Sequence, residues 1–357
     1  MIVSTDLRHR KYGLSTKLLE PNIKNSAGGL RDLHTVMWLV RGTGLAALPS
    51  RLRPSDTALT ALLRSPLLRK HFGSRFLKET ERGLNFLLRV RNEMHLDAQS
   101  LHDTMEFNLQ RKVAKALRYK DSAKRTSVER FMKDYYIAAR YVSQLARRIM
   151  NWAHDRYLGE PESKSVQRLD ATFIIKNKKL DLNRKTRKLS GEQALHAFLL
   201  SLEHSVSFSH NLEDVLTRSA TTYRHLQRAS DALLFRELLN KPHGVAPAIQ
   251  QMNDLGLLAR WIPEWKGLVA FFQHNQYHFY TADEHTLIVL ANAEALEGQP
   301  SGLGDVFRSL ARRDTLYLAA LCHDIAKPIR VGDHEIIGVD VARTILTRFH
   351  CLDVLDD

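Results

Sequence analysis

The chain has 357 residues, of which 44% are hydrophobic, and its 53 basic and 39 acidic side chains give a formal net charge of +14. This length and apolar content suit two or three domains with cores of their own and exclude a disordered chain. The two cysteines cannot form a disulfide framework, which suits a cytoplasmic location. The sequence has neither an apolar run of membrane-spanning length nor a signal-peptide core, so we expect no membrane partner. The basic residues are spread out along the chain, so nucleic acid is not the expected partner.

Hydrophobic periodicity predicts a mainly α-helical fold. The clearest pattern, at 126–152, places six apolar residues on one helical face: Phe131, Tyr135, Ala139, Val142, Leu145 and Ile149. Thr126 and Glu129 have capping-box spacing at the start of this pattern. Further helices are predicted near 29–42, 56–70, 76–97, 106–118, 191–204, 211–218, 222–239, 244–255 and 257–261.

One segment departs from the helical pattern. The stretch "ATFIIKNKKLDLN", residues 171–183, has β-branched residues around a polar centre at 176–178, which predicts a small β-hairpin. The polar region 155–168 before it contains Gly159 and Pro161 and is expected to be a loop. Pro263 interrupts the helical pattern, and a new helical pattern starts after "FYTADEHTL", residues 279–287. A domain boundary is therefore expected around 265–275.

A possible metal site lies in "LCHDIAKPIRVGDHE", residues 321–335. His323 and Asp324 end an apolar helical run, and on a helix they would lie about 100° apart, so both can face one ion. Pro328 and Gly332 then predict a loop. Asp333 is a suitable N-cap for a further helix, with His334 in its first turn.

An upstream histidine extends this set. Thr281 and Glu284 have capping-box spacing, so His285 falls in the first turn of another helix. Four ligand-type residues thus occupy the ends of three successive helices, and imidazole and carboxylate groups suit a divalent metal that activates water for phosphoester hydrolysis. For any one histidine, local capping or packing is the simpler interpretation. For the set in this order we favour the metal site.

The order of these residues resembles that of the HD-domain phosphohydrolases. "QHNQYHFYTADEHTL" and "LYLAALCHDIAKPIRVGDHEIIG" are similar to the HD domain of the bacterial PII uridylyltransferase/uridylyl-removing enzymes, the GlnD family. "EPNIKNSAGGLRDLHTVMWLVRG" resembles the segment that closes their nucleotidyltransferase domain. "PAIQQMNDLGLLARWIPEW" resembles their linker before the HD domain.

The resemblance implies three regions. They are the C-terminal end of a nucleotidyltransferase domain at 1–45, a helical linker domain carrying the hairpin at 46–265, and a truncated all-α HD domain at 266–357. The family adds UMP from UTP to a tyrosine of the PII signalling protein, and its HD domain removes the uridylyl group in nitrogen regulation. Glutamine regulates both activities through C-terminal ACT domains, which this sequence lacks.

The resemblance also implies site residues. His285, His323, Asp324 and His334 would bind a divalent metal, with Mg or Mn expected, and Asp324 and Lys327 would take part in catalysis. Lys327 would offset phosphate charge. Five residues of the "NIKNSAGGLRD" stretch would contact a nucleotide: Asn22, Lys24, Gly28, Gly29 and Arg31. From the residues alone, the start of a core helix at Gly28 and Gly29 is the favoured interpretation, and only the resemblance makes nucleotide contact comparable to it.

The sequence departs from the family pattern in several places. The paired aspartates of the nucleotidyltransferase domain are absent, so uridylylation by this chain alone is not expected. Asn275 stands where the family often has aspartate, and the later metal ligands of HD domains have no assigned counterpart. Two alternatives therefore stay open: another HD-domain nucleotide phosphohydrolase, and an inactive helical binding fragment.

Overall fold

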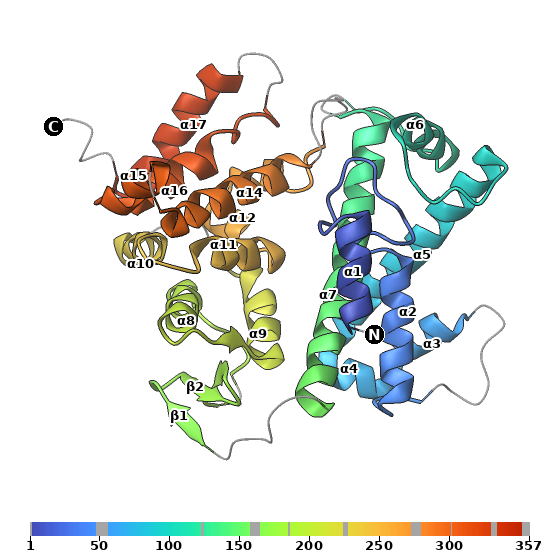
Figure 1. Ribbon diagram of the computed structural model, residues 1–357, viewed down its shortest axis with the longest axis horizontal. Helices are drawn as coiled ribbons and strands as arrows, with labels where there is room; N and C mark the ends of the chain where they lie inside the picture. Colours follow the sequence, from blue (N-terminus) through green and yellow to red (C-terminus); the bar gives the residue numbers. More distant parts are fainter. Residues whose placement is uncertain are drawn as a thin grey trace. The chain divides into compact units, whose positions relative to one another are not determined.

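The structure, a computed structural model, describes residues 2–47, 56–122, 125–157, 165–184, 186–223, 228–272, 280–300, 302–329 and 334–351. The chain divides into two compact units. The N-terminal unit comprises Met1–Pro161 and Phe272–Thr281, and the C-terminal unit comprises Glu162–Phe271 and Ala282–Asp357. Helices dominate both units (Figure 1), which confirms the mainly α-helical class.

The N-terminal unit is organised around one long helix, α7 (Ser127–Tyr157), which packs against α2, α5 and α6 (Figure 1). All six apolar residues of its predicted face are at most 1% exposed. The predicted capping box is also present, because Thr126 N donates to Glu129 and Glu129 N donates to Thr126 Oγ1. The other helices are α1 (Ile2–Tyr12), α2 (Leu30–Gly42), α3 (Ala58–Leu63), α4 (Pro66–Phe72), α5 (Ser74–Ala98) and α6 (Phe107–Ala116).

The turn before α2 lies directly against α7. Gly28 has a φ of +76°, and a Cβ atom at this position would lie 2.3 Å from the carbonyl oxygen of Ala139. Its N–H donates to Asp32 Oδ2 at 2.7 Å, so the turn is also tied to the first turn of α2. Glycine is therefore required at position 28 both by the backbone conformation and by the close approach of two backbones.

Replacing Gly28 with alanine is expected to lower the free energy of unfolding by about 3 kcal/mol or more. A left-handed conformation costs a non-glycine residue about 1–2 kcal/mol, and relief of the contact with Ala139 adds about 1–3 kcal/mol. Urea unfolding followed by circular dichroism measures the loss. Gly44→Ala is the matched control, because Gly44 has a φ of +66° and, among the described residues beyond its chain neighbours, no atom lies within 4 Å of its added Cβ. Equal losses in the two variants would contradict the role of the Ala139 contact.

The C-terminal unit begins with a small sheet in the order β1-β2-β3-β4. β1 (Val166–Arg168), β2 (Phe173–Lys176) and β3 (Lys179–Leu182) pair antiparallel, while β4 (Ser207–Phe208) pairs parallel with β3. β2 and β3 form the predicted hairpin. Asn177 and Lys178 connect them with φ values of +52° and +57°, as a two-residue hairpin turn of the type I′ class requires.

The helices of the C-terminal unit share a continuous apolar core. Phe198 and Phe235 meet the ring of Trp261 edge-on, and the buried Trp265 donates its Nε1–H to Asn253 Oδ1 at 2.9 Å. The helices are α8 (Gly191–Glu203), α9 (His210–Ala220), α10 (Ala229–Leu239), α11 (Val245–Asp254), α12 (Leu258–Trp261), α13 (Trp265–Leu268), α14 (Ala282–Ala295), α15 (Leu303–Ser309), α16 (Arg313–Cys322) and α17 (His334–Arg348), with a 3₁₀ turn η1 (Leu296–Gly298).

Three predicted elements differ from the structure. The region 155–168 is not all loop, because α7 continues to Tyr157 and β1 starts at Val166. The helix expected at 56–70 is two helices, since Pro66 lacks the N–H that a continuing helix needs and instead begins α4. The helix expected at 222–239 begins only at Ala229. Among the described residues, no helix is both long and apolar enough to cross a membrane.

Candidate metal centre

The candidate metal centre lies in the C-terminal unit, where the start of one helix meets the end of another. His285 is in the first turn of α14, and His323 is the residue that follows the last turn of α16. α14 and α16 pack side by side (Figure 1). Residues that are 38 positions apart in the sequence are therefore brought to one place, and Asp324 follows His323 directly.

Three of the four predicted ligands converge. One ligand atom from each of His285, His323 and Asp324 lies within 4.8 Å of the other two. Asp324 Oδ2 is 3.3 Å from His323 Nε2 and 4.0 Å from His285 Nε2. Ligands bound to one ion through bonds of about 2.1 Å are roughly 3–4 Å apart, so this donor set fits a single divalent metal after small side-chain movements.

Burial and charge distinguish the three ligands. The side chain of Asp324 is 8% exposed, while those of His323 and His285 are 35% and 46% exposed. The carboxylate therefore forms the floor of the site and the imidazoles face solvent. Burial alone would raise the pKa of Asp324, but hydrogen bonds with His323 and Lys327 hold that pKa well below its usual value. Asp324 is thus ionised at neutral pH, as a metal ligand must be.

A backbone carbonyl fixes the ring of His323. Its Nδ1 lies 2.7 Å from the carbonyl oxygen of Ala320, and because a carbonyl only accepts, Nδ1 carries the proton. In the neutral imidazole the lone pair is then on Nε2, which is the nitrogen that faces Asp324. The pKa of His323 is raised, first by its hydrogen bond with Asp324, although burial opposes this.

Lys327 is also placed at the site. Its Nζ donates to Asp324 Oδ2 at 2.7 Å, and its side chain is 14% exposed. The two residues are three apart in the chain, which brings their side chains to the same side of the turn. The positive charge at this position partly neutralises Asp324.

His334 and Asn275 are the other two residues that the sequence analysis considered for this site. His334 is the first residue of α17, but only its backbone belongs to the described part of the chain. Asn275 lies outside the described residues. The carbonyl of Ala320 was not predicted, because a backbone acceptor leaves no signature in the residue type.

The five residues expected at a nucleotide lie in the N-terminal unit. Asn22 has a local role, since its Oδ1 accepts from Asn25 N at 2.8 Å and its Nδ2 donates to Thr104 Oγ1 at 3.2 Å. Gly28 and Gly29 are buried within the turn before α2. The side chain of Lys24 is 35% exposed, and Arg31 is half-buried, as Asn22 is. The two cations are therefore partly accessible.

Two family models match the chain. Residues 282–355, which include the His–His–Asp cluster, match the HD domain, and this places the segment in the class of HD-domain proteins. Residues 1–150 match the family described as GlnD PII-uridylyltransferase. The resemblance to the uridylyltransferase/uridylyl-removing family is therefore confirmed, and the two matched regions follow each other in the expected order.

Full-length relatives agree with these models. The bifunctional uridylyltransferase/uridylyl-removing enzyme of Azospirillum brasilense is 31% identical over 97% of this chain and 37% of its own length. The enzyme of the same name from Pseudomonas putida strain W619 is 30% identical over 96% of this chain and 37% of its own length. The chain thus spans little more than a third of these relatives. No solved structure gives a significant match.

Proposed function

We propose that this chain is the uridylyl-removing part of such an enzyme and hydrolyses the bond between UMP and a tyrosine of the PII protein. The observation that carries the proposal is the convergence of His285, His323 and Asp324 within the segment that matches the HD domain. His334 is proposed as a fourth ligand or a phosphate contact. A divalent ion, with Mg or Mn expected, would supply an activated water and polarise the phosphoryl group.

The residues around the centre have separate tasks in this proposal. Asp324 provides the buried negative charge that binds the cation, and the Ala320 carbonyl orients His323 so that Nε2 faces the ion. Lys327 contributes charge toward the phosphate of the uridylyl group, and its contact with Asp324 keeps the ammonium at the site. The exposed edge formed by His285 and His323 leaves the substrate open access from solvent.

We propose a second role for the "NIKNSAGGLRD" stretch, which is contact with the UTP or UMP nucleotide. Lys24 and Arg31 are the proposed contacts, because their cationic side chains are partly exposed. Asn22, Gly28 and Gly29 would support these contacts by shaping the loop and the start of α2. PII and uridine nucleotides are accordingly the proposed partners.

The test is release of UMP from uridylylated PII by the purified chain in the presence of Mn²⁺ or Mg²⁺. We expect Asp324→Asn to reduce the rate by at least about 100-fold, because the buried charge that holds the metal is lost. His102→Ala is the control, since His102 precedes Asp103 in another His-Asp dipeptide of the sequence but lies in the N-terminal unit, where its ring contacts Glu106. Hydrolysis of free nucleotides but not of uridylylated PII would point to a different HD phosphohydrolase. No UMP release by a metal-loaded chain would refute the proposed activity.

A further inference from the structure

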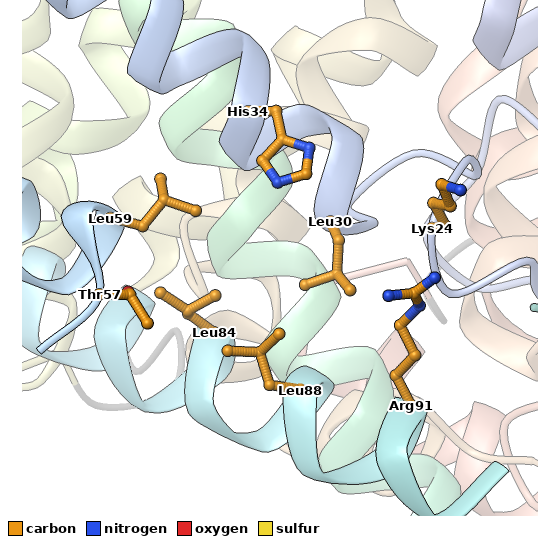
Figure 2. A pocket seen from close by; sticks show the side chains of 8 residues that line it. All are labelled: Lys24, Leu30, His34, Thr57, Leu59, Leu84, Leu88 and Arg91. Carbon is orange, nitrogen blue, oxygen red and sulfur yellow. The ribbon is translucent and has the colours of Figure 1, made fainter. Parts of the chain in front are cut away.

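A pocket of about 240 Å³ lies in the N-terminal unit between α2, α5 and the start of α3 (Figure 2). Its walls are leucines: Leu30 from α2, Leu59 from α3, and Leu84 and Leu88 from α5. Leu84, Leu88 and Arg91 follow one another at spacings of four and three residues, so they share one face of α5. The pocket thus has an apolar body that continues into a charged end.

The charged end is formed by Lys24 and Arg91, which lie together on one side of the pocket in Figure 2. Arg91 donates to Asp103 through Nε at 2.8 Å and Nη2 at 3.4 Å, while Lys24 Nζ is 3.7 Å from Asp103 Oδ2. One carboxylate therefore faces two cations. The two side chains remain 35% and 28% exposed, so their remaining donors are open to a ligand.

His34 shares the pocket with these cations. Its ring projects from α2 at the pocket wall (Figure 2). The pKa of His34 is lowered, first by burial and then by the charges of Arg31, Arg91 and Lys24. Three cations from the loop, α2 and α5 thus repel a proton at this position. Thr57, the other polar group of the lining, is occupied as the N-cap of α3.

We propose that this pocket binds a small organic anion, with an apolar ring or short chain against the leucines and a carboxylate or phosphate at Lys24 and Arg91. The volume is near the lower end of small-molecule sites, so the ligand is compact. Neither the leucines nor the cations alone would select such a molecule, whereas the combination does. This site goes beyond the hydrolysis proposed above and involves no residue of the metal centre.

The test titrates the full chain with phenyl phosphate, benzoate and UMP, while nuclear magnetic resonance follows the ring of His34. A bound anion is expected to raise the pKa of His34, because it offsets the three cations. Benzyl alcohol and inorganic phosphate should bind at least about tenfold more weakly than the preferred organic anion, since each lacks one half of the required chemistry. The comparison of phenyl phosphate with benzoate identifies the head group.

Variants locate the binding to the pocket. Lys24→Met should weaken binding of the organic anion by about fivefold or more, as expected for loss of a charge-assisted contact. Leu88→Phe should weaken it by filling the apolar body. Lys78→Met, an exposed residue on the same helix as Arg91, makes the same change in charge and should have no effect.

The outcomes separate this site from the nucleotide contact proposed for Lys24. Binding of UMP that is lost in Lys24→Met supports both proposals. Binding of phenyl phosphate or benzoate without UMP supports the pocket and removes the nucleotide contact. The pocket proposal is overturned if no probe shifts His34, if Lys24→Met binds as tightly as the wild type, or if inorganic phosphate binds as well as the organic anions.

Discussion

A chain carrying both His323→Ala and Asp324→Ala is expected to lose its divalent metal completely. Two of the three converging ligands are then gone, and the remaining one, His285, is 46% exposed. Even together with His334, the proposed fourth ligand, this exposed imidazole binds Mn²⁺ or Mg²⁺ too weakly to survive purification, because these ions need several oxygen or nitrogen donors. Elemental analysis and calorimetric titration with Mn²⁺, Mg²⁺ and Zn²⁺ measure the loss.

The single variant Asp324→Asn separates charge from shape at this centre. An amide fills nearly the same volume but removes the buried negative charge, and Lys327 then contributes an uncompensated positive charge beside the ion. We expect metal affinity to fall by at least about 100-fold, which exceeds the 10–100-fold effect typical of residues that only support a ligand. His102→Ala should keep its metal. Stoichiometric metal in the double variant would contradict the assignment of the centre.

The fold was predictable wherever local pattern and tertiary packing agree. The face of α7 was predicted because a long amphipathic helix shows its buried side directly in its periodicity. The hairpin was predicted because β-branched residues flank a short polar turn. α1 was missed, since its residues form no clear apolar stripe and its position depends on contacts of Arg8 and His9 with Asp32. β1 was missed because all three of its residues are exposed.

For the candidate metal centre, the sequence indicated which residues could be ligands but not how they are arranged. His323 and Asp324 are adjacent in the sequence and His285 starts a helix, so their types and positions indicated ligands before their distances were known. The orientation of His323 by the carbonyl of Ala320 depends on the path of the backbone at the end of α16. The contact between Lys327 and Asp324 likewise depends on the turn that follows α16, which residue types alone do not determine.

Asp32 is the residue of the "GGLRD" stretch whose importance the sequence did not reveal. It is fully buried. Its carboxylate accepts hydrogen bonds from Arg8 Nη2 at 2.5 Å and from Gly28 N at 2.7 Å, and it lies 2.9 Å from His9 Nε2. One carboxylate therefore connects α1, the turn at Gly28 and the first turn of α2. This arrangement identifies Asp32 as a structural anchor of the N-terminal unit.

Replacing Asp32 with alanine is expected to lower the stability of the N-terminal unit by about 3–5 kcal/mol. Arg8 would keep only its hydrogen bond to the Asn25 carbonyl, and the Gly28 N–H would lose its acceptor. Removing one member of a buried ion pair costs far more than removing a surface pair. Hydrogen exchange of the Gly28 amide and of α2 measures the effect within this unit, which avoids the assumption that the whole chain unfolds in one step.

Glu79→Ala provides the comparison for this prediction. Glu79 pairs with Arg82 on the surface of α5, where the side chains are 29% and 64% exposed, so its loss should cost no more than about 1 kcal/mol. Asp32→Asn should fall close to Asp32→Ala, because Arg8 and the Gly28 N–H donate to the two different carboxylate oxygens, and an amide nitrogen at either position cannot accept. If Asp32→Ala exchanged as slowly as Glu79→Ala, α1 and the Gly28 turn would have to be held by apolar packing rather than by this carboxylate.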